Sequence, residues 1–114
     1  MVTVEGVDPK MIANNLEPSE PTHPGELLKE EIEYRSISQK KLSKETDIPY
    51  KTLNDILNCR RPVTANTALL IEAALGIPAH ILTGLQTDYN MQAAKKNRSF
   101  MERLENIRKI AAVL

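Results

Sequence analysis

Residues 38–57 read SQKKLSKETDIPYKTLNDIL, and this stretch decides the fold. Ser38 predicts the start of a short helix over residues 39–46, because a serine hydroxyl can accept a hydrogen bond from a free N–H of the first turn. Asp47 ends that helix, since aspartate tolerates the left-handed conformation that a sharp turn needs. Another helix follows over about residues 50–58. The stretch therefore predicts two short helices joined by a tight turn.

The turn and the 50–58 helix each contribute apolar residues to the core. Ile48 can reach the core from within the turn, and Pro49 suits a helix start, where its missing N–H would have no partner anyway. At 100° per residue, three apolar residues lie on one side of the 50–58 helix. These are Leu53, Ile56 and Leu57. The opposite side carries Lys51, Asn54, Asp55 and Asn58.

Helices are expected on both sides of this pair. Pro24 opens a first helix over about residues 24–35. Thr64 is expected to cap a fourth helix over residues 65–75, which Gly76 ends. That fourth helix is apolar almost all round, which predicts a place at the centre of the core.

Two more helices are expected towards the C-terminus. Pro78 opens a fifth helix, and Ser99 followed by Glu102 fits a capping box that starts a last one. The last helix carries an apolar stripe of Phe100, Leu104, Ile107, Ala111 and Leu114. Either the chain's own core or a second subunit must cover this stripe.

The composition favours one all-α domain. A chain of 114 residues has the size of a single compact domain. Aromatic residues make up only 4% of it and Trp is absent, which disfavours a strand-rich sandwich. We divide the chain into an N-terminal arm over 1–21, a helical domain over 22–95 and a C-terminal helix over 96–114.

The sequence predicts a cytoplasmic protein. Cys59 is the only cysteine, so the chain forms no internal disulfide. The N-terminus lacks the basic start and apolar stretch of a signal peptide. No segment approaches the roughly 18 consecutive apolar residues of a membrane span. We therefore expect neither secretion nor a membrane role.

Charge is distributed unevenly along the chain although its formal sum is zero. Residues 1–34 carry eight acidic residues and two lysines, an excess of six negative charges. Residues 35–61 carry seven Lys or Arg and three acidic residues, an excess of four positive charges. The predicted helix pair therefore lies in a basic segment that follows an acidic one.

The outer face of the 50–58 helix has the chemistry to contact DNA. Lys51 can donate to guanine O6 or N7, Asn54 can pair with adenine N6 and N7, and Asp55 can accept from cytosine N4. Four flanking residues are placed to hold the DNA backbone: Thr52, Lys40, Arg60 and Arg61. The alternative is that these polar residues form only a solvated helix face.

A known family shares these motifs. The segments that resemble the Xre/Cro-type, lambda-repressor-like helix-turn-helix domain are 38–42, 47–53 with Ile56, Thr64 and 74–77. Pro21-Thr22-His23-Pro24-Gly25-Glu26 ahead of them and Leu85-Gln86-Thr87-Asp88-Tyr89 behind them resemble the HigA-type antitoxin branch. The resemblance implies a five-helix helix-turn-helix domain, here with an extra C-terminal helix.

The resemblance also implies roles for single residues. Gln39 would contact a phosphate, and Tyr50, Lys51, Asn54 and Asp55 would face the major groove. The full predicted DNA-binding set is Ser38, Gln39, Lys40, Tyr50, Lys51, Thr52, Asn54, Asp55, Arg60 and Arg61. The chain departs from the family pattern at Asp47 and Cys59, where Gly is usual, and at Pro49, where Ser is usual. Loss of the serine cap predicts a helix weaker by about 1 kcal/mol.

Catalytic and metal chemistry find little support. His23, His80 and Cys59 lack the spacing of metal ligands, so no metal or other cofactor is expected. His23 is expected to be local structure ahead of the first helix. The acidic run Glu30, Glu31 and Glu33 lies on an exposed helix face with no sign of the burial that would tune a catalytic carboxyl. We predict that the protein is not an enzyme.

Three functions fit the sequence. The resemblance implies a sequence-specific DNA-binding antitoxin of a type II toxin–antitoxin pair, which represses its own promoter and neutralises a small RNase toxin. The second is a stand-alone phage-type or housekeeping repressor without a toxin. The third is a protein-interaction module that uses the helix-turn-helix as a scaffold.

The expected partners are a double-stranded DNA operator, a small basic RNase-type toxin and a second copy of the chain. The acidic N-terminal segment can steer a basic protein towards it. One reading helix covers only a half-site, so two-fold symmetry is needed to place two of them. We expect the fifth and sixth helices to form much of this dimer interface.

Overall fold

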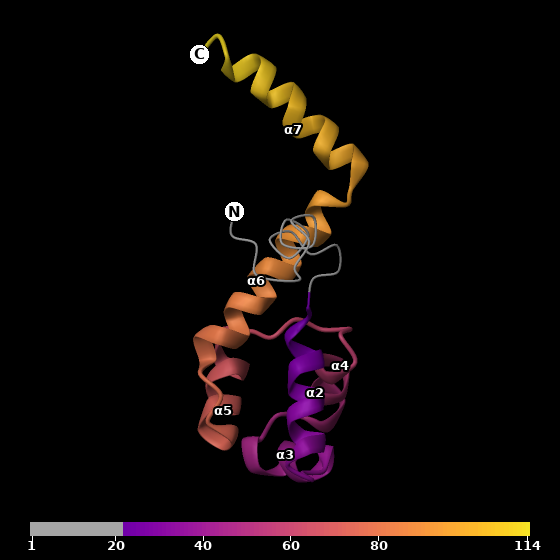
Figure 1. The fold of residues 1–114 in the computed structure, drawn as a ribbon, viewed down its shortest axis with the longest axis vertical. Helices are drawn as coiled ribbons and strands as arrows, with labels where there is room; N and C mark the ends of the chain where they lie inside the picture. The colour runs from indigo at the N-terminus through magenta and orange to yellow at the C-terminus, as the bar shows by residue number, and fades with distance from the viewer. Residues whose placement is uncertain (1–21) are drawn as a thin grey trace, which may run out of the picture.

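The computed structural model describes residues 22–114, and within this range all regular secondary structure is α-helix (Figure 1). The elements are α2 (Pro24–Tyr34), α3 (Gln39–Thr46), α4 (Tyr50–Leu57), α5 (Ala65–Leu75), α6 (Ala79–Lys95) and α7 (Arg98–Ala111). The predicted fold class, an all-α five-helix domain with an additional C-terminal helix, is confirmed. The predicted arm over 1–21 lies outside the described residues.

The turn between α3 and α4 is built as the sequence predicts. The Ser38 hydroxyl caps α3 by accepting from the N–H of Lys41 at 3.0 Å. Asp47 ends the helix with a left-handed φ of 61°, and Ile48 is buried. The hydroxyl of Thr46, also buried, accepts from the N–H of Ile48 at 3.3 Å. Hydrogen bonds within the turn and one apolar anchor therefore fix the direction in which α4 leaves α3.

The core of α2 to α6 is almost wholly aliphatic. Its buried members are Leu28, Ile32, Leu42, Ile48, Leu53, Ile56, Leu57, Val63, Ala68, Ile71, Leu75 and Leu82. The prediction that the 65–75 helix lies at the centre of this core is wrong in part. α5 buries one side only, while Leu69 and Leu70 stay 56% and 43% exposed. The helix packs mainly on α6 and α3, so apolar residues on its other side face solvent.

α2 and α4 meet backbone to backbone at Gly25. A Cβ at this position would lie 1.9 Å from the carbonyl oxygen of Ile56, far inside any allowed contact. His23 caps the same end of α2, because its Nδ1 accepts from the N–H of Gly25 at 2.9 Å. The His23 ring also meets the Tyr89 ring edge to face, with 4.9 Å between centroids. The first turn of α2 is thus held against both α4 and α6.

His23 performs its cap as a buried neutral ring. Burial lowers the pKa of His23, and the negative charge of Glu26 acts in the opposite direction. Only the neutral imidazole leaves Nδ1 free to accept from Gly25, so the lowered pKa and the cap support each other. The expectation that His23 is local structure ahead of the first helix is confirmed.

Two polar side chains form hydrogen bonds that join helix ends. Nη1 of Arg35 donates to the carbonyl of Leu75 at 2.7 Å and ties the end of α2 to the end of α5. The carboxylate of Glu72 accepts from the N–H of Ala79 at 2.9 Å and so caps α6. Pro78, the N-cap residue of α6, supplies no such bond. Helix ends carry unpaired N–H and C=O groups, and these contacts satisfy two of them.

α7 begins earlier than predicted and extends away from the other helices (Figure 1). Asn97 caps it by accepting from the N–H of Phe100 at 3.0 Å, so the predicted capping box of Ser99 and Glu102 is wrong. Asparagine caps as well as serine does, and it lies two residues nearer the end of α6. α7 packs on α6 and buries none of its own residues. It does not fold back on the core.

We predict opposite effects for alanine at two helical glycines. Gly25→Ala should lower the free energy of unfolding by about 2–3 kcal/mol, because the new methyl group must push α2 away from the α4 backbone. Gly84→Ala is the matched control: nothing lies within 4 Å of a Cβ there. It should raise the free energy of unfolding by about 0.5–1 kcal/mol. Urea unfolding followed by circular dichroism measures both, and equal effects would contradict the close α2–α4 contact.

Candidate nucleic-acid interface

α4 separates an apolar side from a polar side. Leu53, Ile56 and Leu57 are buried, as their spacing predicts. Tyr50 and Lys51 are exposed on the helix's first turn. Asn54 and Asp55, the other members of the predicted reading face, are partly exposed, as is Thr52 on its flank. The helix therefore rests on the bundle by one side and presents mixed donors and acceptors on the other.

The two ends of α4 are held differently. At its start Pro49 makes no side-chain cap bond, as its residue type predicts. At its end Cys59 adopts a left-handed φ of 61°. The N–H of Arg60 bonds to the carbonyl of Asp55 at 2.7 Å, and that of Cys59 bonds to the carbonyl of Ile56 at 3.0 Å. This is the Schellman arrangement, which normally uses glycine at the left-handed position.

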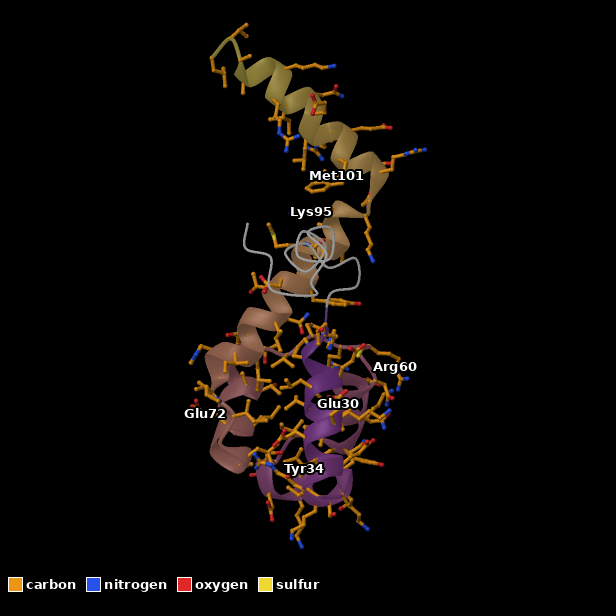
Figure 2. All side chains as sticks on the ribbon, in the orientation of Figure 1. Glu30, Tyr34, Arg60, Glu72, Lys95 and Met101 are labelled. Carbon is orange, nitrogen blue, oxygen red and sulfur yellow. The ribbon has the colours of Figure 1, made fainter. Side chains whose placement is uncertain are left out.

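The Schellman turn sends the chain back along α4 and brings Arg60 beside the reading face. Nη2 of Arg60 lies 3.3 Å from Oδ1 of Asp55 and donates to Oδ1 of Asn54 at 3.1 Å. Nε of Arg60 lies 3.4 Å from the same Asp55 oxygen, and Nη2 of Arg61 lies 3.7 Å from the other. Arg60 sits at the outer edge of the bundle (Figure 2). Four of the ten predicted DNA-binding residues thus form one cluster.

The residues predicted on α3 occupy its first turn. The Ser38 hydroxyl serves as the helix cap, and Lys40 is exposed. Gln39 is partly buried, and its Nε2 is a buried donor that has no hydrogen-bond partner among residues 22–114. Because this nitrogen is buried, contact with a phosphate oxygen would require the Gln39 side chain to turn outwards.

The link between Asp55 and Arg60 was not predicted from sequence. Salt bridges within a helix follow a spacing of three or four residues, whereas these two residues are five apart and span the helix end. Only the left-handed conformation of Cys59 brings them together. The one available signal is the appearance of Cys59 at a position where the family usually has glycine.

The part of the chain that the structure describes contains neither a candidate metal site nor a candidate membrane span. Residues 22–114 hold no group of three His, Cys, Asp or Glu side chains that could bind a metal ion. His80 is exposed on α6. No helix within the same residues is both long and apolar enough to cross a membrane.

Sequence comparison relates the chain to one family and to one further protein. The family described as Helix-turn-helix matches residues 28–82, which run from α2 into α6. Virulence-associated protein I of Dichelobacter nodosus is 31% identical over 77 residues, covering 67% of this chain and 71% of that protein. The matched regions include the whole of α3, the turn and α4.

Structure comparison gives neighbours over a longer span. An addiction module antidote protein of the HigA family from Coxiella burnetii is 33% identical with a TM-score of 0.68, covering 76% of this chain and 94% of that chain. The Pseudomonas aeruginosa antitoxin HigA, solved with the higBA promoter, is 26% identical with a TM-score of 0.69 and the same coverage.

We predict that a double substitution on α4 abolishes sequence preference. Lys51→Ala with Asn54→Ala removes two donors that can read base edges, and each base contact is worth about 1–3 kcal/mol of discrimination. A competition gel shift should show operator and random duplex bound equally, with helical circular dichroism unchanged. Asn66→Ala with Lys95→Ala removes the same residue types from exposed positions on α5 and α6 and should keep the preference. Unchanged specificity in the α4 variant would overturn its assignment as the reader.

Proposed function

The chain belongs to the Xre/Cro-type helix-turn-helix family and to its HigA-type branch, and from this premise we propose that it is a DNA-binding antitoxin of a type II toxin–antitoxin pair. In this role it represses its own promoter and neutralises a small RNase toxin in the cytoplasm. The observation that carries the proposal is the two-sided α4, with a buried apolar side and an exposed polar side at the position of a recognition helix.

On DNA, α4 enters the major groove and α3 holds the backbone. Tyr50, Lys51 and Asn54 face the bases. Residues on the flanks contact phosphates: Ser38, Gln39, Lys40, Thr52 and Arg61. The zero formal charge of the chain limits sequence-independent attraction, so fitted contacts contribute much of the affinity.

A small basic toxin is the proposed protein partner. α2 carries Glu26, Glu30 and Glu33 exposed on its surface, and four further acidic residues precede it in the sequence. Glu31 is partly exposed and pairs with Arg35 at 2.9 Å. An acidic surface of this kind attracts a cationic protein and favours its encounter over that of other proteins.

A homodimer is the proposed assembly, with 22–95 as the DNA-binding domain and 96–114 as the dimerisation helix. The α7 stripe is open to a second copy: Phe100 is 43% exposed and Ile107 is 50% exposed. Leu104 is partly exposed, and Ala111 and Leu114 are exposed. An isolated 14-residue helix is marginal in water, so burial of this stripe would stabilise α7. Two copies would place two α4 helices about 34 Å apart on one face of DNA.

For the toxin, we predict co-purification at low salt that weakens as salt rises. The probe is the product of any short reading frame for a basic protein that adjoins this gene, co-expressed with the full chain. Glu30→Gln with Glu33→Gln should weaken capture at low salt, because it removes two exposed charges of α2. Glu102→Gln with Glu105→Gln removes two exposed charges of α7 and serves as control.

Each outcome of the toxin experiment selects between functions. A neighbouring basic protein that never binds, with operator binding retained, would favour the stand-alone repressor. Capture without any duplex binding would favour the protein-interaction module. Equal capture after deletion of residues 1–20 would show that the predicted arm has no role in the partnership.

For the dimer, we predict that truncation after Asn97 produces a folded monomer. α7 contributes no buried residue, so the shortened chain should stay folded. Its unfolding midpoint should no longer depend on protein concentration, because the dimer is lost. Sedimentation should give the monomer mass, and an operator with two half-sites should be bound far more weakly. A truncated protein that stays dimeric would place the interface elsewhere, and one that unfolds would make α7 part of the core.

A further inference from the structure

Asp55 is poorly placed to read a base, and its surroundings suggest another role. Its side chain is only 19% exposed, and Arg60 and Arg61 approach its two carboxylate oxygens from different sides. Oδ1 already accepts from both Nε and Nη2 of Arg60, and Nη2 of Arg61 lies 3.7 Å from Oδ2, so little of the carboxylate is left for cytosine N4. An unpaired carboxylate beside DNA phosphates is repelled by them, which favours keeping the ion pairs of Asp55 with the arginines.

Arg60, in contrast, is presented to solvent in a fixed way. Its side chain is 61% exposed, and its backbone is pinned by the Schellman hydrogen bond to Asp55. Asp55 engages the Nε–Nη2 edge of the guanidinium. Nη1 has no hydrogen-bond partner within residues 22–114, and at the Nη1–Nη2 edge only Asn54 intervenes. One edge is therefore held by Asp55, while the other is occupied only at Nη2, by Asn54.

We infer that Asp55 is a positioning residue, and that Arg60, held by Asp55 alongside α4, is the specificity-determining side chain that recognises a guanine edge. This rests on the proposed DNA-binding function. The Nη1–Nη2 edge has the two parallel donors that match guanine O6 and N7. Asn54 gives up its bond to Arg60 on docking and becomes free to contact the neighbouring base pair. Arg60 thereby moves from the backbone contacts, where its sequence position put it, to the base contacts.

The matched comparison is between Arg60 and Arg61. Both follow α4 in the same loop and both approach Asp55, but only Arg60 forms hydrogen bonds with it. Lysine at either position keeps the charge but replaces the planar two-donor fork by a single flexible ammonium, which Asp55 cannot hold in one orientation towards guanine. A difference between Arg60→Lys and Arg61→Lys therefore reports geometry and not charge.

The experiment selects binding sites from a pool of random-sequence duplexes with the full wild-type chain and then measures base preference at every position for each variant. Arg60→Lys should lose a guanine preference at one position of each half-site by about tenfold to a hundredfold. Asp55→Asn should lose the preference at that same position. The double variant should lose no more than either single one, because both act through one contact. Arg61→Lys should keep the preference.

A direct readout in the free protein accompanies the selection. The Nε–H of Arg60 should give an NMR signal protected from solvent exchange, and Asp55→Asn should abolish the protection. This measurement needs no DNA and no change in Arg60 itself. If Asp55→Asn does not fold, the comparison of Arg60→Lys with Arg61→Lys still decides whether Arg60 reads a base.

Several results would overturn the inference. Asp55→Asn could change the preference at a different position from Arg60→Lys, or the two effects could add. Asp55→Asn could tighten binding to all duplexes alike, as removal of a repulsive charge would. Retention of the guanine preference by Arg60→Lys would also overturn it. Failure of the wild-type chain to enrich any duplex would instead contradict the proposed DNA-binding function itself.

Discussion

The contact between the first turn of α2 and the backbone of α4 is the constraint on which the reading surface depends. Gly25 allows it, because any side chain at this position would occupy the space of the Ile56 carbonyl. His23 fixes the turn from one side by its cap and fixes α6 from the other through Tyr89. The apolar side of α4 is thereby packed on the bundle, and this fixes the orientation of its polar side.

Polar contacts set the angles between helices, while apolar burial supplies the bulk of the stability. The aliphatic core would tolerate some sliding of one helix on another, but hydrogen bonds at helix ends do not. Arg35 on the carbonyl of Leu75 and Gln86 on the N–H of Val63 are such bonds, and both reach over 20 residues along the chain. At the end of α4, local backbone hydrogen bonds of Cys59 and Arg60 bring Arg60 beside the reading face.

Local rules predicted most of the fold and the outer face of the reader. Ser38, Asp47 and Thr64 each act through neighbours within a few residues, so their types sufficed to place helix ends. Contacts between distant segments were beyond such rules. No local pattern predicts the approach of Gly25 to Ile56. The apolar composition of α5 predicts a central helix, but the number of its neighbours is a property of the whole bundle. The pair of Asp55 and Arg60 needed the left-handed Cys59 between them.

The central claim is that α4 and the turn after it form the surface that meets DNA. It is tested most directly by mapping backbone amide chemical shifts of the full chain as a duplex enriched from the random pool is added. The account predicts the largest changes at the start of α3, along Tyr50 to Asp55 and at Arg60 and Arg61, with the exposed leucines of α5 unaffected. Changes concentrated on α2 or α5, with α4 unmoved, would contradict it.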